Sequence, residues 1–328
     1  MKKIICMSLL LTLLVGCGNT KADSVFTDDE LSILDAYGLA DKAQNECENQ
    51  KTVKLMLKND FVKSNFKTYC QLKVDSVDGI NELIAEGVSK RDIEKYMALS
   101  YFNKAKISRY LKYDADSVKK KVLAVNMNLD KTPYEDATVV SSVEKDALIN
   151  PYNELASNYE PENLINVIEV CDNNTDYCYE DIKADKRVVN AFHDLAQAAS
   201  TKGFDLKAVS GYMDKATQSR AYALAATTKG SNYADKYVGR VNFNENGTGL
   251  ALDVMIDELK PEAIEESKYY DWFTKNLSKY GFILRYSEDK EQETLMGKRS
   301  YHIRYVGLDL AQKLSDKKMS LEYYYATK

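Results

Sequence analysis

The sequence predicts an α+β protein that begins with a small helical module. Apolar residues recur at near-helical spacing between Asp29 and about Tyr113. The second half instead mixes helices with short, separated strands and lacks a regular strand–helix alternation. A chain of 328 residues that is 45% hydrophobic and has only four Pro is too apolar to be disordered, and it is long enough for two domains.

Charge and histidine content exclude several functions. The formal net charge of −5 argues against nucleic acid as the main partner. The chain contains two histidines, His193 and His302. Any site that needs two imidazoles must therefore use both, and histidine-rich metal chemistry is excluded.

The first residues have the pattern of an export signal. A positive start at Lys2 and Lys3 is followed by an apolar run over residues 4–15, which is too short to span a membrane. The run ends in Leu-Val-Gly-Cys at residues 14–17, which resembles a bacterial lipobox in which Cys17 is lipidated. We expect residues 1–16 to be a lipoprotein signal peptide and the protein to be lipid-anchored on the outer face of the bacterial cytoplasmic membrane. An ordinary cleaved signal with an incidental cysteine is the alternative.

A polar tether over residues 17–28 and a helical module over residues 29–125 follow. Residues 80–84 before Gly87 indicate a helix with a glycine stop, and Ser89 with Asp92 resembles a capping box that starts the next helix. Residues 122–126 are predicted as a short strand. Nothing in this module suggests chemistry, so we expect it to act as a structural spacer or a protein contact.

An exported chain can form disulfides. Cys6 is removed with the signal and Cys17 carries lipid, so four cysteines remain and allow three connectivities. Proximity favours Cys47–Cys70 and Cys171–Cys178, and free buried thiols are the alternative. The absence of a C-x2-C pair argues against a zinc site made of cysteines.

The second domain is expected over residues 126–328. Its predicted helices cover residues 181–199, 216–228 and 269–280, and its predicted strands cover residues 206–212, 249–256, 282–286 and 302–306. His193 lies beside the apolar face of the first of these helices. We interpret it as a surface or boundary residue rather than a ligand.

Three segments of the second domain carry a resemblance. They are Ser210-Gly211-Tyr212 followed by Gln218, the run at residues 249–254 that ends in Asp253-Val254, and the run at residues 301–307 that contains His302. In order and spacing they are similar to the VanY-type D-alanyl-D-alanine carboxypeptidases, zinc peptidases that trim bacterial cell-wall stem peptides. The resemblance covers residues 126–328 and implies a VanY-like α+β domain with zinc on a central antiparallel sheet.

The resemblance also assigns roles residue by residue, and several positions differ from the family pattern. Asp253 and His302 match two zinc ligands, but the first ligand histidine is replaced by Asn246, and the general-base glutamate is replaced by Arg299. An amide is not a usual zinc donor, and arginine cannot accept a proton. The arginine that receives the substrate carboxylate is replaced by Met213. The remaining positions that the resemblance assigns to substrate binding are Ser210, Tyr212, Gln218, Arg240, Tyr301 and Tyr305.

Three functional hypotheses follow. The first is a cell-wall-associated lipoprotein that is inactive or weakly active and binds peptidoglycan stem peptides or another anionic peptide. In it, Arg299 with Arg240 and Lys298 holds a carboxylate, unless Arg299 only pairs with Asp253. The second is an active zinc D,D-carboxypeptidase that uses substitute groups, namely Glu245 or His193 as ligand and Glu291 or Glu293 as base. The third is a surface protein-interaction lipoprotein that uses its 24 tyrosines for contacts. Zinc is expected only if the site still functions.

Overall fold

The computed structural model describes residues 24–167 and 182–328. The predicted signal peptide, the lipidation site Cys17 and the predicted Cys171–Cys178 pair lie outside these residues. The chain forms two compact units that divide between Ile107 and Ser108, earlier along the chain than the predicted domain boundary at residues 125 and 126. Within the described ranges no helix has both the length and the apolar character needed to cross a bilayer.

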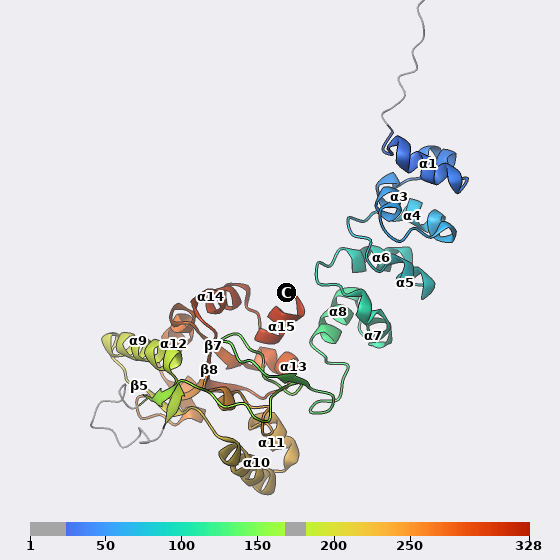
Figure 1. Ribbon diagram of the computed structural model, residues 1–328. Coiled ribbons are helices and arrows are strands. Elements are labelled where there is room, and N and C mark those ends of the chain that lie inside the picture. The colour runs from blue at the N-terminus through green and yellow to red at the C-terminus, as the bar shows by residue number, and fades with distance from the viewer. Residues whose placement is uncertain (1–23, 168–181) are drawn as a thin grey trace, which may run out of the picture. The chain divides into compact units, whose positions relative to one another are not determined.

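The first unit is built from short helices (Figure 1). They are α1 (Asp28–Ala36), α2 (Ala40–Asn45), α3 (Gln50–Leu57), η1 (Lys63–Asn65), α4 (Phe66–Gln71), α5 (Ile80–Ala85), α6 (Lys90–Met97) and η2 (Lys104–Lys106). The Ser89 side chain accepts a hydrogen bond from the Asp92 backbone N–H, which confirms the predicted start of α6. A disulfide joins Cys47, after α2, to Cys70 in α4.

The predicted strand over residues 122–126 is wrong, because these residues belong to helix α8 (Val118–Asn126). Val118, Val122 and Val125 recur at spacings of four and three and are all buried, which is the pattern of one helix face. Ser117 caps the helix by accepting a hydrogen bond from the Lys120 backbone N–H. The short run at 122–126 does not by itself distinguish a strand from a helix, but its extension by four residues to Val118 does.

The second unit contains a four-stranded antiparallel sheet in the order β5-β6-β8-β7. Its strands are β5 (Leu206–Ser210), β6 (Ala251–Ile256), β7 (Phe282–Tyr286) and β8 (Arg299–Tyr305). They confirm the four strands predicted for this domain. Two small sheets precede the larger one: β1 (Thr138–Val140) pairs in parallel with β2 (Asn153–Leu155), and β3 (Leu164–Asn166) pairs antiparallel with β4 (Lys183–Asp185).

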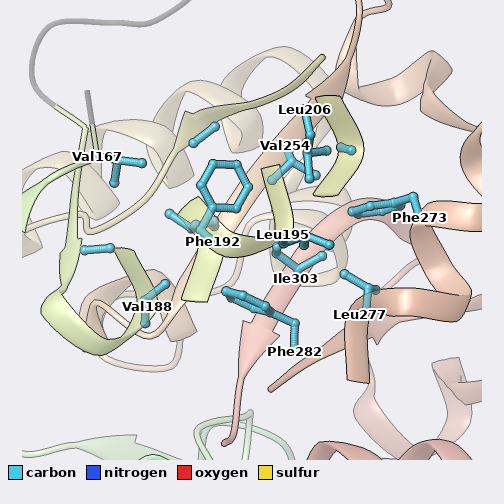
Figure 2. Close-up of a cluster of buried hydrophobic side chains, with 14 of the residues drawn as sticks. Val167, Val188, Phe192, Leu195, Leu206, Val254, Phe273, Leu277, Phe282 and Ile303 are labelled. Carbon is cyan, nitrogen blue, oxygen red and sulfur yellow. The ribbon is translucent and has the colours of Figure 1, made fainter. Parts of the chain in front are cut away.

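Helix α9 (Lys186–Lys202) forms the core with one face of this sheet. Figure 2 shows Phe192 and Leu195 of α9 packed among Val254, Leu206 and Ile303 of the strands. Asp185 caps α9, so the helix predicted from residue 181 begins five residues later. The other helices are α7 (Ile107–Lys112), α10 (Lys215–Lys229), α11 (Ser231–Tyr237), η4 (Glu245–Thr248), η5 (Pro261–Glu266), α12 (Tyr270–Asn276), η6 (Leu277–Tyr280), η7 (Glu288–Lys290), α13 (Glu291–Thr294), α14 (Leu308–Lys317) and α15 (Leu321–Ala326).

Candidate functional site

The candidate site lies on the sheet face opposite α9. Strands β6 and β8 pair so that Asp253 stands directly across from His302. The two side chains are joined by a hydrogen bond of 2.6 Å between His302 Nδ1 and Asp253 Oδ1. His302 is fully buried, and its ring packs on Tyr286 with the ring centroids 5.0 Å apart.

Asn246, at the position of the family's first zinc histidine, lies buried in η4. Its side-chain Nδ2 donates a hydrogen bond of 2.8 Å to the carbonyl oxygen of Gly211, directly after β5. Its backbone N–H donates to the Asn244 side chain. The amide therefore ties η4 to the loop after β5.

Glu245, the predicted substitute ligand, is already engaged by two arginines. Its Oε1 accepts a hydrogen bond of 2.9 Å from Arg285 Nε and lies 3.1 Å from an Arg304 nitrogen, and all three side chains are almost completely buried. Burial opposes ionisation of Glu245, but the two guanidinium groups outweigh it and hold the pKa of this carboxyl well below its usual range. Its second oxygen, Oε2, lies 3.9 Å from His302 Nε2.

Arg299, at the general-base position, is 7% exposed at the start of β8. Its guanidinium carbon lies 4.4 Å from the centroid of the Tyr286 ring, whose other contacts include His302. Within the described residues the Arg299 Nε has no hydrogen-bond partner, and the guanidinium forms no ion pair with Asp253. The pairing considered for Arg299 and Asp253 is therefore not formed, and Arg299 instead stacks on an aromatic ring.

The other cations and carboxylates suggested for the site have partners of their own. Arg240 forms two hydrogen bonds to Asp235, of 2.8 and 3.0 Å, and Lys298 pairs with Glu265 at 2.7 Å. The substitute bases are engaged likewise: Glu291 pairs with Lys236, and Glu293 accepts a hydrogen bond from Ser320. His193, in α9, is about half exposed, and its nearest acidic group is Asp194, at 3.8 Å.

The segment that the resemblance assigns to substrate binding borders a cavity. Tyr212, Met213 and Gln218 line a hollow of about 250 Å³. Gln218 is buried and fixes the loop, because its side chain donates to the Met213 carbonyl oxygen and accepts from the Asn242 backbone N–H. Ser210 lies opposite Asp253 in the register of β5 and β6.

Tyr301 and Tyr305 lie on the other face of β8. Successive residues of a strand point to opposite faces, and both tyrosines pack with Ile303 against the core that α9 covers. Burial and the Asp253 carboxylate raise the pKa of Tyr301 to about 12. The strand register thus brings Ser210, Asp253 and His302 together, with Asn246 bonded to the loop after β5. Arg299 is linked to this group through the Tyr286 ring, whereas the two tyrosines pack against the core.

The donor set does not fit catalytic zinc. Such sites use three protein ligands from His, Asp, Glu or Cys and leave a position for water. Asp253 and His302 supply two donors, while Asn246 and Glu245 are held by other partners. In residues 24–167 and 182–328 no group of three or more His, Cys, Asp or Glu side chains is arranged to hold a metal ion.

Comparisons with known proteins agree with this fold. The family model for VanY, D-alanyl-D-alanine carboxypeptidase, matches residues 181–308. The putative carboxypeptidase YodJ of Bacillus subtilis is 30% identical over 64% of this chain and 80% of its own length. The bifunctional D-Ala-D-Ala dipeptidase and carboxypeptidase VanXYC of Enterococcus gallinarum is 30% identical over 54% of this chain and 92% of its own.

A solved structure of the LD-carboxypeptidase LdcB, described as revealing peptidoglycan recognition, is also similar. It superposes with a TM-score of 0.51 at 29% identity, over 59% of this chain and 92% of that one. The chain belongs to the VanY family of D-alanyl-D-alanine carboxypeptidases, which confirms the predicted resemblance and fold class. Its second unit is a D-Ala-D-Ala carboxypeptidase-like domain of the kind that acts on peptidoglycan.

Sequence reasoning missed the buried ionic network beneath the site. Arg285 of β7 bridges Glu245 to Glu322 of α15 with hydrogen bonds of 2.9 and 2.6 Å to the Glu322 carboxylate. The available signal was a charged residue within each apolar segment: Arg285 in β7 and Glu322 in the last helix. Fully buried charges need partners, so these residues could have been predicted to pair.

Proposed function

We propose that this chain is a lipid-anchored member of the VanY family that binds peptidoglycan stem peptides on the cell surface with little or no hydrolysis. The observation that carries the proposal is the pairing of Asp253 with His302, with an amide at Asn246 and a guanidinium at Arg299 beside them. The anchor at Cys17 would hold the protein on the outer face of the cytoplasmic membrane through lipid and without a spanning helix.

The chemistry of hydrolysis supports the loss of turnover. Amide hydrolysis by a zinc peptidase needs a metal that acidifies water and a base that takes the proton. Arg299 has no acceptor atom, so it cannot replace a glutamate base. Its positive charge on the ring that contacts His302 also opposes a dication at that point.

Binding is supported by the hollow beside Tyr212 and Gln218 and by Arg299, which forms no ion pair with the side chains that the structure describes. A stem peptide ends in a carboxylate, and a guanidinium binds a carboxylate through charge-assisted hydrogen bonds. Arg240 and Lys298 already have acidic partners, so Arg299 is the cation of the three that can bind a carboxylate without first breaking an ion pair.

The test uses residues 17–328 with the substitution Cys17→Ser, incubated with a stem pentapeptide ending in D-Ala-D-Ala. We expect calorimetry to detect binding and mass spectrometry to detect no loss of the terminal alanine, with or without added zinc. The matched variants are Arg299→Gln, which should weaken binding at least about tenfold by loss of a charge-assisted pair, and Lys298→Gln, which should not.

The alternative is an active zinc carboxypeptidase with substitute ligands, which family membership favours. Release of alanine that stops on addition of a chelator would establish this alternative. Equal binding by the wild type and by Arg299→Gln would remove Arg299 from the proposal.

A further inference from the structure

Two successive stretches of the N-terminal half have the same order and lengths of helices. The first consists of α2, α3, η1 and α4, with 6, 8, 3 and 6 residues. The second consists of α5, α6, η2 and α7, again with 6, 8, 3 and 6 residues. Each helix of the second stretch begins 40 or 41 positions after its counterpart in the first.

The sequence repeats with the same period, although weakly. Identical residues stand 41 positions apart at the end of the two stretches. The pairs are Phe61 and Phe102, Lys63 and Lys104, Tyr69 and Tyr110, Asp75 and Asp116, Ser76 and Ser117, and Val77 and Val118. The two stretches therefore share a sequence signature as well as a helix pattern.

Burial follows the repeat position by position. Residues 61–69 and residues 102–110 have the same succession of buried, half-buried and exposed side chains. In the preceding helices Val53 and Met56 are buried where Ile93 and Tyr96 are buried 40 positions later. A shared pattern of burial at non-identical residues indicates that packing is what the two stretches have in common.

Each stretch also makes the same bond to the helix that follows it. The fully buried Tyr69 donates its hydroxyl hydrogen bond to Asn81 Oδ1 in α5. The fully buried Tyr110 donates in the same way to Asn126 Oδ1 in α8, at 2.9 Å. The acceptors differ in position, because Asn81 lies near the start of α5 and Asn126 ends α8. In both cases the bond passes from one stretch to the helix that follows it, and contacts between neighbours are what stabilise tandem repeats.

We propose that residues 39–79 and 80–120 are two copies of one helical repeat, and that this array is a modular spacer whose length changes in whole copies. The burial pattern that the two copies share at non-identical residues favours a spacer over a repeated ligand site, and part of the exposed surface differs between them. At the exposed pair Lys42 and Glu82, for example, the charge changes sign. The biological role, separating the membrane anchor from the family domain, rests on the proposed function, whereas the repeat itself does not.

The experiment changes the number of copies in residues 17–328 carrying Cys17→Ser. Deletion of residues 77–117 joins Ser76 to Val118 and restores the Asp-Ser-Val sequence, so Tyr69 would replace Tyr110 opposite Asn126. A second variant duplicates residues 77–117. The control deletes residues 77–97, about half a period, and joins Ser76 to Ala98 out of phase.

Circular dichroism measures the helix content, and limited proteolysis measures whether the N-terminal half is folded. The fluorescence of Trp272, the single tryptophan of the chain, reports the second unit. The deletion and the duplication of residues 77–117 each change the array by one whole copy, and we call them the in-phase variants. We expect both to resist the protease as the wild type does, and the control to be cut at least about tenfold faster. The Trp272 unfolding transition should stay unchanged in both in-phase variants.

The repeat is supported if at least one in-phase variant resists the protease while the control is cut rapidly. The repeat is overturned if neither in-phase variant resists the protease, or if the control resists equally well. A Trp272 transition that shifts in a resistant in-phase variant overturns the spacer role, because the second unit would then depend on copy number. None of these measurements uses a peptide substrate, so failure of the proposed binding function leaves their interpretation unchanged.

Discussion

Arg299 is a residue at which the candidate site differs from the family pattern. It stands in β8 three positions before His302, where the family pattern has the general-base glutamate that takes a proton from water. In the structure its guanidinium stacks on Tyr286 and Nε is buried without a hydrogen-bond partner among the described residues. A cation fixed in this place favours bound anions and opposes a bound metal ion, because opposite charges attract and like charges repel.

Restoring the family residues should restore metal binding. We expect the triple variant Met213→Arg, Asn246→His and Arg299→Glu to bind zinc at least about tenfold more tightly than the wild type, because a second imidazole completes three donors and the competing cation is gone. Equilibrium dialysis against zinc measures the affinity.

The control for this prediction is Arg299→Gln, which removes the cation but adds no donor. It should gain little zinc affinity compared with the triple variant. A wild-type chain that binds zinc as tightly as the triple variant would show that another side chain already supplies the missing ligand.

At the residue scale, sequence patterns located the site better than they described its bonding. The motifs placed Asp253 and His302 together, and β6 and β8 do bring them into register. Sequence could not reveal that Asn246 bonds to Gly211 or that Glu245 is held by two arginines, because these partners are 35 to 59 positions away and meet only through the sheet topology.

At the scale of elements, the site is supported by a buried ionic network that joins four of them. Glu245 comes from η4, Arg285 from β7, Arg304 from β8 and Glu322 from α15. Each side chain is essentially unexposed, so removing one partner leaves a buried charge without compensation. The last helix is thus tied through Arg285 to the segment that carries Asn246.

Glu245→Gln should destabilise the second unit in a pH-dependent way. At pH 7 we expect a loss of about 3–5 kcal/mol in the free energy of unfolding. The pKa of Glu245 is depressed in the folded state, so its contribution is present above the ordinary glutamate pKa of about 4.3 and is lost as the pH falls below it. Urea unfolding followed by Trp272 fluorescence at several pH values measures both effects.

The matched control is Glu265→Gln. Glu265 also has a lowered pKa, caused by hydrogen bonds from Lys298 and Ser300, but its side chain is 42% exposed. Solvent screens such a pair, so this variant should cost less than about 1 kcal/mol. Equal losses from the two substitutions would contradict a special role for the buried network.

The helices and strands could be predicted from the sequence where the apolar pattern was long or where a capping residue marked its start. The four strands of the main sheet and the capped helices α6 and α9 agree with the sequence, whereas residues 122–126 form part of a helix. A five-residue apolar run fits both periodicities, and only its continuation to Val118 distinguishes them. The small sheets β1–β2 and β3–β4 carry no such pattern, because each strand has three residues.

At the scale of the whole molecule, the chain combines two compact units with different sources of stability. The second has a sheet, a long covering helix and a continuous apolar core. The first is made of helices of three to nine residues, which are too short to be stable alone and depend on packing and on the Cys47–Cys70 disulfide. The equivalent positions in the second repeat copy, Gly87 and Leu111, cannot form such a bond.

Removing this disulfide should therefore weaken one unit and spare the other. The bond closes a loop with a sequence separation of 23 residues, for which the loss of loop entropy in the unfolded chain corresponds to about 3 kcal/mol. In the double variant Cys47→Ser and Cys70→Ser, we expect the helical signal of the first unit to melt at lower temperature. The Trp272 transition should stay where it is in the wild type, because Trp272 lies in α12 against Phe204 of the second unit. If the Trp272 transition falls by the same amount as the helical signal, the two units unfold as one cooperative body and the division into independent units is wrong.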